Sequence, residues 1–188
     1  LPIFHCDIFE ETDYSNFGTG YPDLLAFPDL ESLRRCGWSS GSALVLTRVT
    51  DPHGERSPLD PRGILGEVAA GAGAGEVGLA LSLRAGYGPL RKDWSPEPAP
   101  SFADAWRAGI EGSGIGLVSL EYDGESARCT AELEPLAPVQ AADALVTVRS
   151  AAREIGLVEG YTVTTMGRLG GGDPDGRLSI SAPGLPGD

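Results

Sequence analysis

The part of the sequence that most constrains the fold is residues 115–156, where two alternating stretches meet at a turn and a helical pattern follows. The stretches Ile115–Tyr122 and Glu125–Glu134 flank the dipeptide Asp123-Gly124. This dipeptide is typical of a two-residue type I′ turn, because both central residues of that turn need positive φ. The pattern therefore predicts a β-hairpin.

The expected hairpin has one apolar face and one polar face. Its turn places Leu120 opposite Ala127 and Val118 opposite Cys129, while the residues between them are polar. An antiparallel sheet commonly buries one face and leaves the other in water. We therefore expect an antiparallel sheet in which Cys129 is a buried core thiol.

A long helix is expected after the hairpin. Pro138 stands in its first turn and Gly156 at its C-terminal end, which are the favoured places of proline and glycine. Residues that recur at helical spacing predict its buried stripe: Leu145, Val148, Ala152 and Ile155. Arg149 and Arg153 lie off this stripe and are expected in solvent.

The other elements are predicted from caps, alternation and breaker residues. Further helices are expected over Pro28–Cys36, which Gly37 ends, from Asp60-Pro61 to Val68, and over residues 101–109, with Ser101 and Asp104 as an acidic capping box. Further strands are expected at residues 3–9, Ser42–Val49, Glu76–Arg84, Tyr161–Met166 and Arg177–Ser181.

These elements predict a single α+β domain over residues 1–188, with one mixed, mainly antiparallel sheet and helices packed mostly on one face. Within it, residues 1–27 form an acidic, aromatic strand-and-loop segment, and residues 85–100 form a long proline-rich loop. A chain of 188 residues suits one domain. No linker is rich enough in glycine or proline to require two.

The chain is acidic, with 27 Asp and Glu against 14 Lys and Arg and a formal net charge of −13. Residues 1–33 hold seven of the acids and neither Lys nor Arg. Such a surface repels phosphate backbones, so nucleic-acid binding is disfavoured. A basic protein partner fits this charge, as does a simple role in solubility.

No stretch of the sequence predicts a membrane span. The longest apolar candidate, Val68–Leu83, is interrupted by Glu76 and several glycines, so it falls short of the roughly 18 residues that a span requires. No signal-peptide pattern opens the chain, and Leu1 leaves open whether residues precede it.

The cysteines and histidines predict neither a disulfide framework nor a metal site. Cys6, Cys36 and Cys129 are odd in number and irregularly spaced, which favours reduced thiols and a cytoplasmic location. With His5 and His53 as the two histidines, no CxxC or HxxxH pattern indicates zinc. We therefore expect no metal and no cofactor.

Three short strings match familiar motifs in the wrong context. Gly37–Gly41 matches the G-x-S-x-G nucleophile elbow, which needs a strand before the serine and a helix after it, whereas the reverse is expected here. Gly73–Gly78 matches G-x-G-x-x-G but is expected to follow a helix and enter a strand. Gly172–Gly176 resembles a calcium loop but lacks its third donor and its terminal Glu. Each string is better explained as a turn or a connection.

The two histidines have different surroundings. His5 and Asp7 are two residues apart on the first expected strand and so share a face. Such a pair can orient an imidazole as a general base, although same-face pairs are common on solvated strands and no nucleophile is placed beside this one. His53, within Asp51–Gly54, is expected in a solvated loop.

The segment most suited to recognition lies in the first 27 residues, which contain six of the 13 aromatic residues. Its candidate binding residues are Asp7, Glu10, Glu11, Asp13, Tyr14, Phe17 and Tyr21. Rings supply contact area and carboxylates supply charge-assisted hydrogen bonds, which suits a cationic protein surface or the wall of a polar pocket. The alternative is an edge loop whose rings cover the sheet.

A second candidate is the one basic cluster of the sequence, formed by Arg84, Tyr87, Arg91, Lys92 and Trp94. It could hold an anionic ligand or contact the acidic segment of a second copy. Its charge is too small a footprint for nucleic acid. Otherwise it is a solvated loop.

Together these features predict a cytosolic, non-catalytic partner-binding protein of the inhibitor, immunity or regulatory type. Its partner would be a basic protein or a copy of itself. The alternative is a small cofactor-independent enzyme of the isomerase or cyclase type, with a pocket between sheet and helices and acid–base groups from His5, Asp7, Tyr14 and Tyr21. A purely structural subunit is the third possibility.

Overall fold

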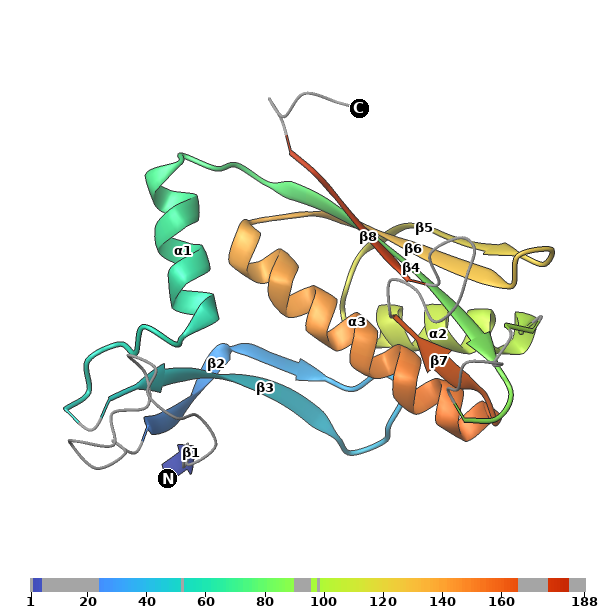
Figure 1. The fold of residues 1–188 in the computed structure, drawn as a ribbon, viewed down its shortest axis with the longest axis horizontal. Coiled ribbons are helices and arrows are strands. Elements are labelled where there is room, and N and C mark those ends of the chain that lie inside the picture. Colours follow the sequence, from blue (N-terminus) through green and yellow to red (C-terminus); the bar gives the residue numbers. More distant parts are fainter. Residues whose placement is uncertain are drawn as a thin grey trace. The chain divides into compact units, whose positions relative to one another are not determined.

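The computed structural model describes residues 2–4, 24–51, 53–89, 96–97, 99–165 and 176–182. The chain divides into two compact units: unit 1 is Leu1–Leu33 with Val45–Gly73, and unit 2 is Arg34–Leu44 with Ala74–Asp188. Figure 1 shows the helices and strands of each. The predicted α+β class is confirmed. The single domain predicted over residues 1–188 stays a prediction.

Unit 1 consists of a three-stranded sheet and one helix. Its strands are β1 (Pro2–Phe4), β2 (Leu24–Arg35) and β3 (Ala43–Thr50), in the order β1-β2-β3, and its helix is α1 (Pro61–Gly71). β1 pairs antiparallel with β2. The first strand predicted at residues 3–9 thus begins as expected, and residues 5–9 lie outside the described part.

The predicted helix over Pro28–Cys36 is wrong, because these residues continue strand β2 and the turn after it. Proline is tolerated in a strand at positions where a backbone N–H would not be hydrogen-bonded to a neighbouring strand. β1 reaches only Leu24 and Leu25, so beyond them β2 has β3 as its one neighbour among the described strands. Pairing with distant residues, which local signals do not show, therefore decides this element.

Helix α1 begins at the predicted Asp60-Pro61, although the Asp60 side chain makes no capping hydrogen bond. The helix is tied to β2 by an ion pair of 2.8 Å between Arg62 Nη1 and Asp29 Oδ2. The hydrogen bond from Arg62 holds the pKa of the Asp29 carboxyl below its usual value. None of the residues of α1 is buried. Polar contacts therefore hold α1 in unit 1.

Unit 2 contains a five-stranded sheet and two helices. Its elements are β4 (Val77–Gly86), α2 (Pro100–Gly112), β5 (Leu117–Asp123), β6 (Arg128–Leu136), α3 (Pro138–Glu159), β7 (Thr162–Thr164) and β8 (Arg177–Ser181). The order is β5-β6-β4-β7, and β7 and β8 pair with successive parts of β4. All these pairings are antiparallel. This β-α-β-β-α-β connectivity is that of the ferredoxin-like arrangement.

The hydrophobic core lies between this sheet and helices α2 and α3, which cover one of its faces (Figure 1). The largest side chains buried there are Trp106, Phe102, Leu83, Ile110 and Val148. Trp106 joins the two helices, because its Nε1–H donates to the Val148 carbonyl at 3.0 Å. The prediction that helices pack mostly on one face of the sheet is confirmed for unit 2.

The predicted hairpin forms between β5 and β6, but its two-residue turn is wrong. Asp123 pairs with Arg128 across a four-residue loop, and Leu120 lies opposite Ala131 rather than Ala127. The Asp123 carboxylate closes this loop, since it accepts the backbone N–H two residues on and a hydroxyl three residues on. The register therefore shifts by an even number of residues, which keeps Leu120 on the buried face.

Two predictions for this hairpin have different outcomes. Cys129 is fully buried, as expected, and lies opposite Tyr122. Val118 is exposed, because an irregularity between Leu117 and Ser119 turns it away from the core.

Helix α3 continues past Gly156, its predicted end, to Glu159, and Gly160 terminates it with φ 83°. Gly156 serves packing instead, because a Cβ there would lie 2.4 Å from Val163 Cγ2. The predicted stripe is largely confirmed: Val148, Ala152 and Ile155 are buried and Leu145 is half-buried. Arg149 and Arg153 are exposed, as expected. No helix in the described part is long and apolar enough to cross a membrane.

We expect the Cys129 thiol to resist alkylation in the folded protein, because burial raises its pKa to about 12 and only the thiolate reacts. The folded pKa lies above the 9.0 of an ordinary thiol, so the stability linked to Cys129 is complete below pH 9 and is lost as the pH rises toward 12. Iodoacetamide labelling with peptide mass spectrometry, in native buffer and in denaturant, measures this. Equal labelling of Cys129 in both would contradict the prediction.

Candidate functional site

The acidic, aromatic segment predicted to carry recognition lies outside the described residues. This applies to all of its candidates: Asp7, Glu10, Glu11, Asp13, Tyr14, Phe17 and Tyr21. It also applies to His5, the candidate general base. Their roles therefore stay predictions.

The basic cluster is described in part. Arg84 lies in β4 and Tyr87 follows that strand, whereas Arg91, Lys92 and Trp94 lie outside the described residues. Tyr87 stacks on Tyr161 with ring centroids 4.8 Å apart, and its hydroxyl donates to the Tyr161 hydroxyl at 3.2 Å. This hydrogen bond raises the pKa of Tyr87. The structure thus pairs Tyr87 with a ring that the sequence analysis did not connect to it.

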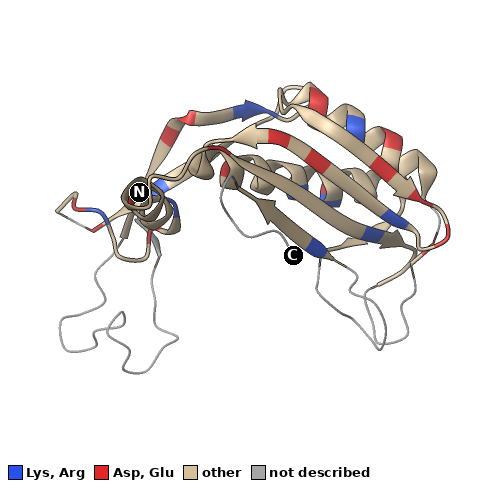
Figure 2. Ribbon diagram, turned by 90° about the horizontal axis from the view of Figure 1, so that it is seen from above, with Lys and Arg blue, Asp and Glu red and all other residues tan. Residues whose placement is uncertain are grey.

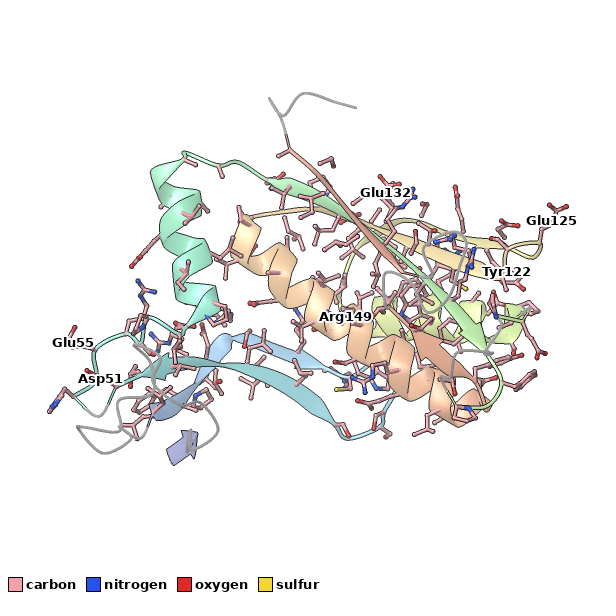
Figure 3. All side chains as sticks on the ribbon, in the orientation of Figure 1. Asp51, Glu55, Tyr122, Glu125, Glu132 and Arg149 are labelled. Carbon is pink, nitrogen blue, oxygen red and sulfur yellow. The ribbon has the colours of Figure 1, made fainter. Side chains whose placement is uncertain are left out.

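The loop after β3 matches its prediction. His53 is exposed, and Asp51 Oδ1 accepts the N–H groups of His53 and Glu55 at 2.9 Å each (Figure 3). The Gly73–Gly78 string connects α1 to β4, as predicted. Of the Gly172–Gly176 string, only Gly176 is described.

The sheet of unit 2 carries polar side chains on the face that α2 and α3 leave uncovered. Acidic and basic residues both occur along these strands (Figure 2). Several polar groups pair with one another: Ser82 Oγ lies 2.9 Å from Thr130 Oγ1, and Ser119 Oγ donates to Glu132 Oε2 at 3.4 Å. These are cross-strand pairs of the kind that stabilise a solvated sheet face. We therefore assign this face a structural role.

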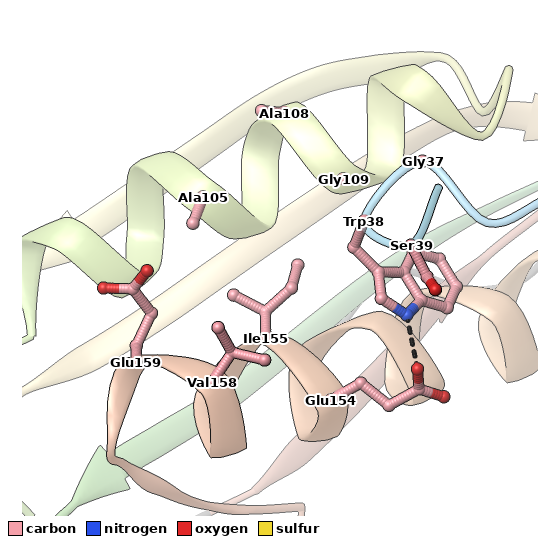
Figure 4. A pocket seen from close by; sticks show the side chains of 10 residues that line it. All are labelled: Gly37, Trp38, Ser39, Ala105, Ala108, Gly109, Glu154, Ile155, Val158 and Glu159. Atoms are coloured by element: carbon pink, nitrogen blue, oxygen red, sulfur yellow. Dashed lines mark hydrogen bonds between the residues drawn. The ribbon is translucent and has the colours of Figure 1, made fainter. Parts of the chain in front are cut away.

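A groove in unit 2 lies between α2, α3 and the turn that follows β2, with a volume of about 360 Å³. Its lining residues are Gly37, Trp38, Ser39, Ala105, Ala108, Gly109, Glu154, Ile155, Val158 and Glu159. Figure 4 shows that they come from three separate parts of the chain. Most of them are apolar, and none is a Lys or Arg.

Glycines bring the turn into contact with α2. A Cβ on Gly37 would lie 2.4 Å from the Gly109 carbonyl oxygen, and one on Gly112 would lie 3.0 Å from Gly37 Cα. The Gly37 N–H donates to Ser113 Oγ at 3.0 Å, and that hydroxyl donates to the Gly109 carbonyl at 2.8 Å. The close backbone approach therefore fixes the turn on the helix and places its next residue, Trp38, at the groove.

The electrostatics of the groove are acidic. Trp38 Nε1–H donates to Glu154 Oε2 at 2.7 Å (Figure 4), and Glu159 supplies a second carboxylate. Burial raises the pKa of Cys36, the residue before the turn, and the charge of Glu154 raises it further. The groove thus combines an indole ring, two carboxylates and an apolar floor.

The sequence did not predict this groove. Trp38 belongs to the Gly37–Gly41 string, which forms a turn between the strands β2 and β3. Trp38 and Glu154 are 116 residues apart, and nothing in the sequence connects them. The available signal was the pair Gly109 and Gly112, three positions apart on α2. Glycine destabilises a helix, so two of them at this spacing indicate that another segment packs closely there.

Unit 1 has a different surface. Among its described residues no apolar side chain is buried, and Leu30 on β2 is 73% exposed and Val68 on α1 63% exposed. The other large apolar side chains exposed in unit 1 are Phe27, Leu33, Val45, Leu59 and Ile64. Over the described part of the chain, no three His, Cys, Asp or Glu residues are grouped so as to hold a metal ion.

No protein-family model and no curated protein matches this sequence. Among solved structures, the chain is similar to one described as "Crystal structure of novel glutamine synthase homolog", with a TM-score of 0.66 and 20% sequence identity. The match covers 93% of this chain and 47% of that one, so this chain spans about half the length of its structural neighbour. At this identity the likeness shows a shared fold.

We expect Gly37→Ala to lower the free energy of unfolding by about 1–3 kcal/mol, because the added Cβ collides with the backbone of α2. Gly75→Ala is the matched control, since a Cβ there meets nothing within 4 Å. Urea denaturation followed by tryptophan fluorescence measures both variants. Equal midpoints for the two variants would show that the turn does not depend on this contact.

Proposed function

We propose that this chain is a non-catalytic protein that binds a basic protein partner, in a regulatory, inhibitory or immunity-type role. The observation that carries the proposal is the number of large apolar side chains that are exposed in unit 1, among them Phe27, Leu30, Leu33, Ile64 and Val68. Exposed apolar side chains in such number are typical of surfaces that another protein covers. Covering one leucine contributes about 1.5–3 kcal/mol, so a few of them supply substantial affinity.

The charge of unit 1 supports a basic partner. The sequence of this unit contains eleven Asp and Glu against three Lys and Arg, so it carries −8 of the total charge of −13. A third of the chain thus holds most of the net charge. Complementary charge speeds the encounter of two proteins and disfavours partners of the wrong sign.

The internal contacts of unit 1 also support this function. α1 is held by the ion pair between Arg62 and Asp29 and by a second one between Arg56 and Glu67. The exposed apolar side chains Ile64 and Val68 of α1 are therefore available to another surface. An interface of this composition has an apolar centre and a charged rim.

The alternative of a small cofactor-independent enzyme stays a prediction. Its acid–base candidates, His5, Asp7, Tyr14 and Tyr21, lie outside the described residues. The space between sheet and helices, where its pocket was expected, contains the buried rings of Phe102 and Trp106 and the side chain of Leu83. The structural neighbour is described as a glutamine synthase homolog, but a likeness at 20% identity does not support an enzymatic activity for this chain.

Neutralising the acids of the first segment is expected to weaken the complex with the basic partner, mainly through slower association. The test variant combines Asp7→Asn, Glu10→Gln, Glu11→Gln and Asp13→Asn. The control variant replaces four exposed glutamates of unit 2 by glutamine, at positions Glu121, Glu125, Glu132 and Glu134. Capture from the lysate of the native host, at low and high salt, identifies the partner. Association rates then compare the variants.

We expect association to slow about tenfold in the test variant and to change little in the control, with the difference lost at high salt. A complex that is indifferent both to salt and to these four acids would rule out the charge-based part of the proposal.

Leu30→Ser is expected to weaken the same complex about tenfold, because one exposed leucine would no longer be covered. The loss should appear in the dissociation rate, since no charge changes. Ile180→Ser on β8 is the control, because Ile180 is also exposed but lies in unit 2 and outside the residues that line the groove of α2 and α3. Equal dissociation rates for the two variants would show that the partner does not cover Leu30.

A further inference from the structure

We propose that the groove lined by Trp38, Glu154 and Glu159 binds an arginine side chain of the basic partner. This inference rests on the proposed function, because it names a group through which a basic protein would be held. Arginine combines an aliphatic stem with a planar cation. The groove offers a matching surface for each of these parts.

The apolar floor fits the aliphatic stem. It consists of Ala105 and Ala108 from α2 and Ile155 and Val158 from α3. The two alanines leave room between the helices, and Figure 4 shows the short side chain of Ala105 pointing toward Ile155 and Val158. Long cationic side chains commonly place their methylene groups on such a surface while the charged end reaches polar groups.

Trp38 and Glu154 fit the guanidinium group. The Trp38 N–H is bonded to Glu154 Oε2, which fixes the orientation of the indole ring beside the carboxylate. Guanidinium groups stack on indole rings and pair with carboxylates through two parallel hydrogen bonds. Glu159, five residues further along α3, supplies a second negative charge at the other end of the floor (Figure 4).

No Lys or Arg in the described part of the chain occupies this groove in place of the partner's arginine. None of the lining residues is a Lys or Arg. Arg107 of α2 donates to the Leu120 carbonyl, which directs it to β5. Arg149 and Arg153 line a separate groove of about 720 Å³ between α3 and β7, where Arg149 Nη2 donates to Thr165 Oγ1 at 3.2 Å. That groove is cationic and would repel arginine.

The test uses the full chain labelled with ¹⁵N and two tripeptides, acetyl-Gly-Arg-Gly-amide and its citrulline counterpart. Citrulline has the shape of arginine but no charge. The indole N–H signal of Trp38, identified by its loss in Trp38→Phe, reports binding, and the buried Trp106 serves as an internal reference. The variants are Glu154→Gln and, as the control, Glu125→Gln in the loop between β5 and β6.

The arginine peptide is expected to shift the Trp38 signal to saturation, with no shift from the citrulline peptide. Glu154→Gln should weaken the binding about fivefold and Glu125→Gln should leave it unchanged. The glutamine at position 154 still accepts the indole N–H, so a loss there reflects charge and not a displaced ring.

Three results would overturn the inference. Equal shifts from both peptides would show that charge plays no part, and equal behaviour of the two variants would place the site elsewhere. Binding of free butylguanidinium without binding of the peptide would show that the groove takes a small cation instead of a protein side chain. None of these results depends on the partner complex. The arginine site can therefore be disproved while the proposed function holds, and the proposed function can be disproved while the groove still binds the arginine peptide.

Discussion

The packing of Trp106 between α2 and α3 is the contact on which the rest of unit 2 depends. Its ring is fully buried, and its N–H is bonded to the Val148 carbonyl across the helix pair. A buried indole needs both the apolar surroundings and this acceptor, so it fixes the distance and the rotation of the two helices together. The flanks of the same helices then form the groove, because Gly109 allows both Ile155 and Trp38 to approach α2 closely.

Unit 1 lacks the buried apolar contacts that hold unit 2 together in the described residues. Its helix is tied by ion pairs, and among its described residues seven large apolar side chains are exposed and none is buried. The exposed ion pair of Arg56 and Glu67 contributes at most about 1 kcal/mol, so it adds little stability to the unit. Covering its leucines and valines by a partner would therefore stabilise the unit as well as the complex, because burial of apolar area is the larger contribution.

The sequence predicted the elements whose signals are local and missed those that depend on distant pairing. The stripe through Val148, Ala152 and Ile155 follows from helical spacing, and it is buried as expected. Pro28 indicated the start of a helix, but it lies in strand β2. Pairing with β3 outweighs the local preference of these residues. Trp38 and Glu154 meet only after α2, α3 and a turn are assembled. A site made of such contacts cannot be predicted from spacing along one element.

Helix α3 shows how a chain of strongly negative net charge can hold two surfaces of opposite sign. Arg149 and Arg153 are one turn apart and share a flank, whereas Glu154 is rotated about 100° from Arg153. Glu154 lines both grooves, and its carboxylate would weaken the cationic one if it turned toward the arginines. The bond from the Trp38 indole draws it to the other side. One hydrogen bond from a distant turn thus keeps the acidic and basic flanks apart, and this separation of charge gives each groove its preference.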